Sequence, residues 1–224
     1  MESSKDSYFN KGKILFLCFF FIVSYVWAEE DVFRHPVSPQ TMNTFNAVSA
    51  NLAENLIIKG NFVQEKYLNR FDRSLMSSGN FIIATEHGMV WETLQPFPST
   101  MILGRDFILQ SRPDGRQSVL SAQGNETFTQ MADVISMVFS GQSQGLLENF
   151  EVYFLGSVSN WTIGLLPRDS VFASFVTRIT MSGDSAIRSI RLFEPNSDII
   201  TYTLSNLSFP AGLNANEEAF FTIP

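Results

Sequence analysis

The sequence predicts a mainly β fold with a few helices (α+β), in which a curved antiparallel sheet forms an incomplete barrel with helices over its mouth. Two observations support this fold class. Segments of strand length with alternating apolar and polar residues follow one another, separated by glycines, prolines and short polar runs. Only two segments have apolar residues at helical spacing, and no internal repeat or linker divides them. Many strands with two helices favour a partly closed barrel.

The first 28 residues have the pattern of a secretory signal peptide. Three lysines precede a short apolar run, and Val26-Trp27-Ala28 resembles a signal peptidase site. The apolar run is about half as long as the roughly 20 residues of a membrane-spanning helix. We therefore expect cleavage after residue 28, so that residues 1–28 are a signal peptide and residues 29–224 form one exported domain. An uncleaved N-terminal anchor is the alternative.

The single cysteine limits the redox and metal chemistry of the chain. Cys18 lies inside the apolar run rather than at its end, so we interpret it as part of the signal peptide and not as a lipid-attachment site. The mature chain then has no disulfide, no thiol nucleophile and no cysteine metal site.

Charge and composition restrict the partners. The full chain has a formal net charge of −7, and an acidic surface repels nucleic acid and anionic headgroups. No nucleic acid is therefore expected as a partner. The chain has 22 phenylalanines, of which five lie in the leader. The remaining rings must be buried or must contact something apolar.

The predicted elements begin after an extended lead-in at residues 29–40. A helix is predicted at residues 41–54, where Phe45, Val48 and Leu52 recur at helical spacing. Strands are predicted at residues 57–68, 75–85, 88–93, 99–104, 106–111 and 117–121, and again at 149–157, 160–166, 174–182, 186–193 and 198–207. A last short strand is predicted around Phe220, Phe221 and Ile223.

A second helix is predicted at residues 127–140. Thr127 and Gln130 match a capping box, and Gly141 follows where a C-terminal glycine belongs. The helix has a broad apolar stripe made of Phe128, Met131, Ala132, Ile135, Val138 and Phe139. Two interpretations stay open: the stripe packs on the sheet as core, or it is a lid whose apolar face can part from the sheet.

The sequence contains no convincing catalytic or metal-binding pattern. His35 and His87 are far apart, and neither a metal-ligand spacing nor a phosphate-binding glycine loop occurs. Residues 141–145 match the letters of the G-x-S-x-G nucleophile elbow, but they follow a predicted helix and no histidine lies downstream. We interpret them as a helix-ending loop. We expect no metal, no cofactor and no enzymatic activity.

A series of residues matches a known family in order and spacing. They are Gly60-Asn61-Phe62-Val63-Gln64, Gly79 with Phe81, Trp91, Pro96, Met101-Ile102-Leu103, and the heptapeptide WTIGLLP at residues 161–167. In this arrangement the chain resembles the LolA-like family of periplasmic lipoprotein carriers. The resemblance covers roughly residues 45 to 210.

The resemblance implies a LolA/LolB-like fold, in which helices close the concave face of the incomplete barrel and form a hydrophobic cavity for acyl chains. It implies a carrier, expected to be monomeric, that takes an acylated lipoprotein or another lipid from an inner-membrane transporter to an outer-membrane acceptor. The candidate lipid-binding residues are Phe62, Phe81, Ile83, Met89, Trp91, Met101 and Leu103 from the sheet, and Phe128, Met131, Ile135, Val138 and Phe139 from the second helix. Each of them is also compatible with a plain core position.

One departure from the family pattern bears on function. Typical carriers have an arginine-proline pair before the tryptophan, with the arginine bonding the lid, and Thr85 and Glu86 occupy these positions here. Gating by that arginine therefore does not carry over. The alternative function is a binding module of the same fold that serves a lipid or glycolipid exporter or senses envelope stress. Arg70, Phe71 and Arg73 form either a partner contact or a solvated loop.

Overall fold

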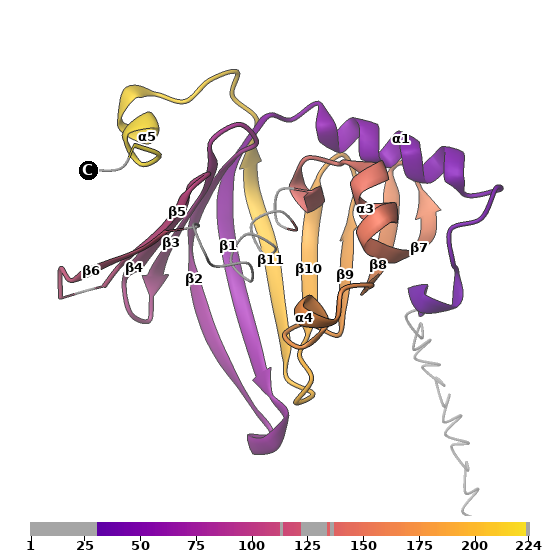
Figure 1. The fold of residues 1–224 in the computed structure, drawn as a ribbon, viewed down its shortest axis with the longest axis horizontal. Coiled ribbons are helices and arrows are strands. Elements are labelled where there is room, and N and C mark those ends of the chain that lie inside the picture. The colour runs from indigo at the N-terminus through magenta and orange to yellow at the C-terminus, as the bar shows by residue number, and fades with distance from the viewer. Residues whose placement is uncertain (1–30, 113, 122–133, 135–136, 223–224) are drawn as a thin grey trace, which may run out of the picture. The chain divides into compact units, whose positions relative to one another are not determined.

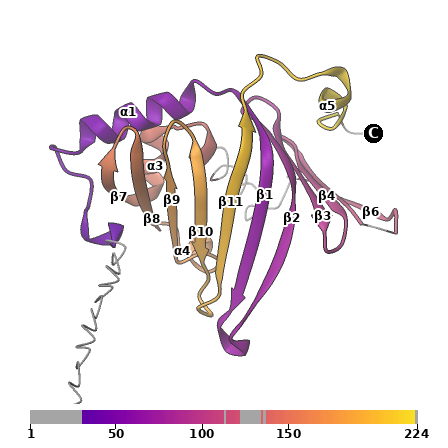
Figure 2. The same ribbon diagram turned by 180° about the vertical axis from the view of Figure 1, so that it is seen from behind.

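An eleven-stranded antiparallel sheet forms the body of the protein. The computed structural model describes residues 31–112, 114–121, 134 and 137–222. Within them the strand order is β6-β5-β4-β3-β2-β1-β11-β10-β9-β8-β7. The sheet is curved, and α3 lies in front of β8 and β9 in Figure 1 and behind them in Figure 2. The predicted fold class is confirmed.

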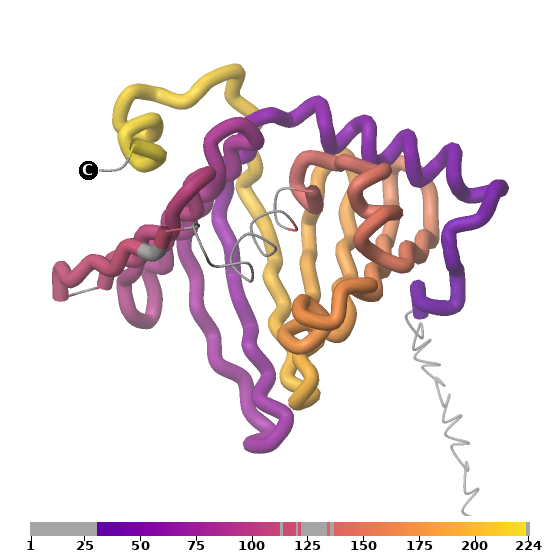
Figure 3. Tube along the Cα trace, viewed as in Figure 1, coloured from indigo at the N-terminus to yellow at the C-terminus, as the bar shows by residue number. Residues whose placement is uncertain are grey.

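The strands match the predicted spans closely. They are β1 (Ile57–Leu68), β2 (Arg73–Ala84), β3 (Gly88–Gln95), β4 (Ser99–Leu103), β5 (Phe107–Ser111), β6 (Gln117–Ser121), β7 (Phe150–Ser157), β8 (Asn160–Pro167), β9 (Arg178–Gly183), β10 (Ile187–Phe193) and β11 (Ile199–Ser208). Most strands pair with their neighbours in sequence, but β1 pairs with β11 and so joins the two halves of the sheet. Figure 3 shows these distant segments, purple and yellow, side by side.

The helices are short apart from the first. They are α1 (Met42–Ala53), α3 (Ser143–Asn149), α4 (Ser170–Ala173) and α5 (Ala215–Ala219), with 3₁₀ turns η1 (Val32–Arg34) and η2 (Asn69–Phe71). The helix predicted at residues 41–54 is confirmed as α1. Most of the helix predicted at 127–140 lies outside the described residues, but residues 134 and 137–139 are helical. Gly141 has the left-handed φ of 61° that is common after a helix C-terminus.

Three local predictions are wrong. The strand predicted at 174–182 begins only at Arg178, because the Asp169 carboxylate accepts the Phe172 N–H at 2.8 Å and starts α4 instead. The last strand is absent from the described residues, since Asn214 and Glu217 form a capping box that starts α5. The segment 141–145 is not only a loop, because α3 begins at Ser143 and buries Leu146.

The N-terminal lead-in covers the outer edge of β7. After η1, the Val37 N–H donates to the Val152 carbonyl and the Phe154 N–H donates to the His35 carbonyl, both at 2.9 Å. The lead-in is therefore only partly extended, and it acts as a short additional edge segment.

Each face of the sheet has its own apolar cluster. The concave face, defined as the one on which α1, α3 and α4 pack, contains a large buried cluster that includes Phe45, Leu146 and Phe172 from these helices. The convex face has a smaller cluster of Val90, Ile102, Phe107 and Leu109, against which Phe221 packs. On this face the Lys59 ammonium holds both Glu217 carboxylate oxygens at 2.6 Å and so attaches α5 to β1.

Two glycine–phenylalanine pairs place large rings over glycines on the concave face. Gly60 is opposite Phe81 and Gly79 is opposite Phe62 in the β1–β2 register. A Cβ on Gly79 would lie 1.8 Å from the Glu92 carbonyl oxygen and 3.0 Å from the Phe62 ring. The space above Gly79 is thus taken by backbone and by an aromatic ring, which an additional side chain would displace.

We predict that Gly79→Ala destabilises the protein by about 1–3 kcal/mol, because the strand or the ring must move to accept the methyl group. The measurement is the free energy of unfolding in urea. Gly212→Ala is the matched control, since a Cβ there meets nothing within 4 Å, and its effect should stay within about 0.5 kcal/mol. Equal stability of the two variants would contradict the packing argument.

Candidate functional site

The candidate residues from the N-terminal strands form two adjacent rows on the concave face. Ile83, Met89 and Leu103 are paired across β2, β3 and β4 in one row. Phe81, Trp91 and Met101 are paired across the same strands in the next row, and Phe62 lies beside them on β1. Phe62, Phe81, Ile83, Met89 and Leu103 are buried, whereas Trp91 and Met101 are half-buried.

The candidate residues from the second helix are described only in part. Val138 and Phe139 are buried in the same cluster as the sheet residues, and Val134 and Met137 pack against it half-buried. Phe128, Met131 and Ile135 lie outside the described residues. The described end of this helix therefore contributes to the same apolar interior as the strands.

Trp91 lies at the centre of an aromatic group. Its ring stacks on Phe62 with a centroid distance of 4.0 Å and on Phe81 at 5.6 Å, and it meets Tyr202 edge-on at 5.3 Å. Both geometries are favourable for aromatic rings. The group crosses from β3 to β11 and connects the two halves of the sheet through side chains.

Sequence reasoning missed the contribution of the C-terminal half. Two further rows continue across β7 to β11 on the same face: Phe154, Ile163, Met181, Ile190 and Tyr202, and Val152, Leu165, Ile179, Leu192 and Ile200. The alternation of apolar residues along these strands was a usable signal, because Ile179 and Met181 point to one face and Thr180 to the other.

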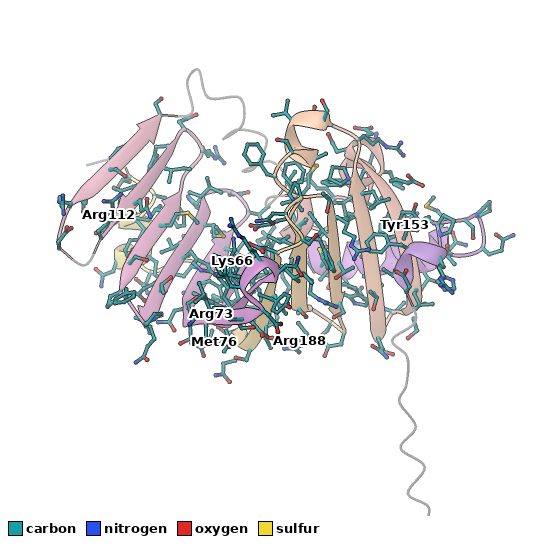
Figure 4. The ribbon with its side chains drawn as sticks, turned by 90° about the horizontal axis from the view of Figure 1, so that it is seen from below. Lys66, Arg73, Met76, Arg112, Tyr153 and Arg188 are labelled. Carbon is teal, nitrogen blue, oxygen red and sulfur yellow. The ribbon has the colours of Figure 1, made fainter. Side chains whose placement is uncertain are left out.

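Polar groups follow the apolar rows toward the β1–β2 hairpin. Along β1, Gln64 and Lys66 continue the face of Phe62, with Tyr202 and Ile200 opposite them on β11. Lys66 Nζ donates to both carboxylate oxygens of Glu194 at 3.0 and 2.9 Å. Figure 4 shows Lys66 and Met76, from the two strands of this hairpin, on opposite sides of the sheet.

Burial raises the pKa of the Tyr202 phenol to about 12, and the negative charge of Glu194 adds to the shift. Both causes disfavour the phenolate. The phenol is therefore a neutral hydrogen-bonding group at any physiological pH, at the border between the aromatic group and the Lys66–Glu194 pair.

The described residues offer no centre for metal chemistry. Among them, no three histidine, cysteine, aspartate or glutamate side chains gather in a way that could hold a metal ion. Ser143 lies at the start of α3, in a turn that connects two helices rather than a strand and a helix. No helix in the described part of the chain is long and apolar enough to cross a membrane.

Comparison with known protein families gives one match. The model of the family described as "Outer membrane lipoprotein carrier protein LolA" matches residues 56–220, which is most of the chain. The chain belongs to the LolA family. Comparison with curated protein sequences found no match.

Several solved structures are similar to this chain at low sequence identity. A LolA superfamily protein from Nitrosomonas europaea has a TM-score of 0.43 and 7% identity, over 80% of this chain and 98% of that one. A putative outer membrane lipoprotein-sorting protein domain from Vibrio parahaemolyticus has a TM-score of 0.40 and 11% identity, over 81% and 100%. LprF from Mycobacterium bovis has a TM-score of 0.42 and 12% identity, over 82% and 99%.

Thr85 and Glu86, which the resemblance matches to the arginine and proline of typical carriers, lie in the turn between β2 and β3. Thr85 donates its hydroxyl to the Leu56 carbonyl at 3.2 Å, and the Glu86 carbonyl accepts from Arg105 Nε at 2.6 Å. Both residues thus serve local contacts of the turn. At the opposite end of the sheet, Arg70, Phe71 and Arg73 are exposed at the hairpin tip, where a partner contact stays a prediction.

We predict that Tyr202 titrates well above an ordinary tyrosine. Because its folded pKa is raised above the unfolded value of about 10, its contribution to stability is complete below pH 10 and is lost as the pH rises toward 12. The loss is on the order of 2–3 kcal/mol. The measurement is the alkaline absorbance change of tyrosinate in wild type minus Tyr202→Phe, with unfolding followed in parallel. A difference spectrum with its midpoint near pH 10 would contradict the burial of this phenol.

Proposed function

We propose that this LolA-family protein is a periplasmic carrier that binds the acyl chains of a lipoprotein, or of a related lipid, on its concave face and takes them from the inner to the outer membrane. The observation that carries the proposal is the continuity of apolar side chains across both halves of the sheet, with the half-buried Trp91 and Met101 among them. The partners are the acylated cargo, an inner-membrane donor and an outer-membrane acceptor.

The energetics suit a carrier. Transfer of an acyl chain from water to an apolar surface is worth about 0.8 kcal/mol per methylene, so a chain of about sixteen carbons gains on the order of 12 kcal/mol. A carrier must supply an equivalent apolar surface and still release its cargo. Met101 and Met137 are half-buried against the concave-face cluster, and such flexible and polarisable side chains adapt to different occupants.

The proposal needs no catalytic group, because no bond is made or broken when a lipid is carried. It also includes export through the predicted signal peptide at residues 1–28, followed by action as a monomer. The alternative within the same family is a binding module for a lipid or glycolipid exporter or for envelope-stress sensing. The replacement of the family arginine by Thr85 motivates it, because a different gate suits a different cargo.

The test is extraction of lipid from the protein after purification from a bacterial periplasm without detergent. A stoichiometric diacyl species identified by mass spectrometry supports a carrier, and a covalently attached peptide on that species identifies a lipoprotein cargo. A glycolipid would instead favour the exporter-linked module. An empty protein that takes up no apolar probe overturns the proposal, and ester cleavage by such a protein would point to a hydrolase.

We predict that Met101→Asp lowers the affinity for an apolar fluorescent probe by at least about tenfold, because a carboxylate on the concave face must be desolvated when an acyl chain covers it. Binding is measured by probe fluorescence, and folding by circular dichroism.

The matched control is Met76→Asp, which makes the same substitution on the convex face at a side chain that is 55% exposed. It should leave probe binding within about twofold of wild type. Equal losses in the two variants, or no loss in Met101→Asp, would exclude the concave face as the binding surface.

A further inference from the structure

On the concave face, an ion pair connects β1 with the end of β10 across the intervening strand β11. Lys66 on β1 and Glu194, directly after β10, lie on either side of β11, and Lys66 is opposite Ile200 in the register. The ammonium holds both carboxylate oxygens at 3.0 and 2.9 Å. The side chains remain 30% and 22% exposed, so both charged groups stay accessible to a ligand.

The ion pair lies at the end of the apolar surface that is proposed to hold acyl chains. Tyr202 connects the two regions, since its ring meets Trp91 edge-on at 5.3 Å and the Glu194 charge acts on its phenol. Along β1 the order is Phe62, Gln64 and Lys66 on the same face. The concave face therefore changes from aromatic to polar to charged within a few residues.

The chemistry of the pair selects a class of headgroup. A neutral glycerol headgroup would leave both charges without a new partner. An anionic headgroup would be attracted to the Lys66 ammonium. It would be repelled by the Glu194 carboxylate and by the acidic chain as a whole, whose formal net charge is −7. A headgroup with one phosphate and one ammonium offers a charge-assisted partner to each side chain and adds no net charge.

We propose that Lys66 and Glu194 form a headgroup site for a zwitterionic phospholipid, with the phosphate at the Lys66 ammonium, the lipid amine at the Glu194 carboxylate, and the acyl chains on Tyr202, Trp91 and Met101. This inference rests on the proposed function and narrows its cargo to lipids of the phosphoethanolamine type. Binding involves no covalent step. The lipid phosphate takes the place of the Glu194 carboxylate beside Lys66, and the lipid ammonium takes the place of the Lys66 ammonium beside Glu194.

The experiment compares three lipids with identical fluorescent acyl chains: phosphatidylethanolamine, phosphatidylglycerol and diacylglycerol. They are delivered from cyclodextrin rather than from vesicles, so that adsorption to a membrane surface is not measured.

Wild type should bind phosphatidylethanolamine at least about tenfold more tightly than the other two lipids. Glu194→Gln should raise binding of phosphatidylglycerol to the level of phosphatidylethanolamine or above, because the lysine loses its competing carboxylate. Lys66→Met should bring both phospholipids down to the level of diacylglycerol.

Lys59→Met is the matched control, because it breaks another lysine–glutamate pair, the one with Glu217 on the convex face. It should leave the lipid preference unchanged. Equal binding of all three lipids to wild type overturns the headgroup site but leaves the carrier proposal intact. A uniform loss for all three lipids in Lys66→Met and Glu194→Gln, accompanied by lower thermal stability, assigns the pair a structural role and also overturns it. Failure of every lipid to bind wild type overturns the carrier proposal itself.

Discussion

The antiparallel pairing of β1 with β11 is the constraint on which the rest of the structure depends. It joins a meander of six strands to a meander of five, and their segments lie more than a hundred residues apart in the sequence. Its register places Leu204, Tyr202 and Ile200 opposite Phe62, Gln64 and Lys66. A shift of one residue would turn every one of these side chains to the other face. The aromatic group around Trp91 and the Lys66–Glu194 pair both exist because this register holds.

The candidate residues of the concave face differ in burial. This difference separates residues that stabilise the sheet from residues that a cargo could reach. Phe62 and Phe81 are almost fully buried and cover the glycines opposite them, so they behave as core. Trp91, Met101 and Tyr202 lie on the same face and remain half-buried. A cargo would contact this second group while the first keeps the sheet in shape. Burial thus distinguishes candidate residues at neighbouring positions, and a lining role for the half-buried ones stays a prediction.

Local patterns predicted the strands well because alternation and turn residues are local signals. The first six strands could be predicted from single segments of the sequence. The same is true of the shared face of Ile83, Met89 and Leu103. Long-range pairing could not be predicted in this way, so Tyr202 and Glu194 were missed, although Tyr202 contacts Trp91 of β3 and Glu194 pairs with Lys66 across β11. The wrong prediction of a last strand near the C-terminus has a different origin. Phe220 and Phe221 read as a strand, but the capping box at Asn214 decides in favour of a helix, and Phe221 packs on the convex cluster.

The lead-in segment along β7 has a consequence for how this edge of the sheet meets other polypeptides. An uncovered outer strand presents a row of backbone donors and acceptors on which another polypeptide can add. Here the hydrogen bonds with His35 and Val37 occupy part of that row. Because these residues belong to the same chain as β7, the protein covers part of the outer edge of this strand with its own lead-in. Self-association through β7 is thereby discouraged while the sheet completes itself.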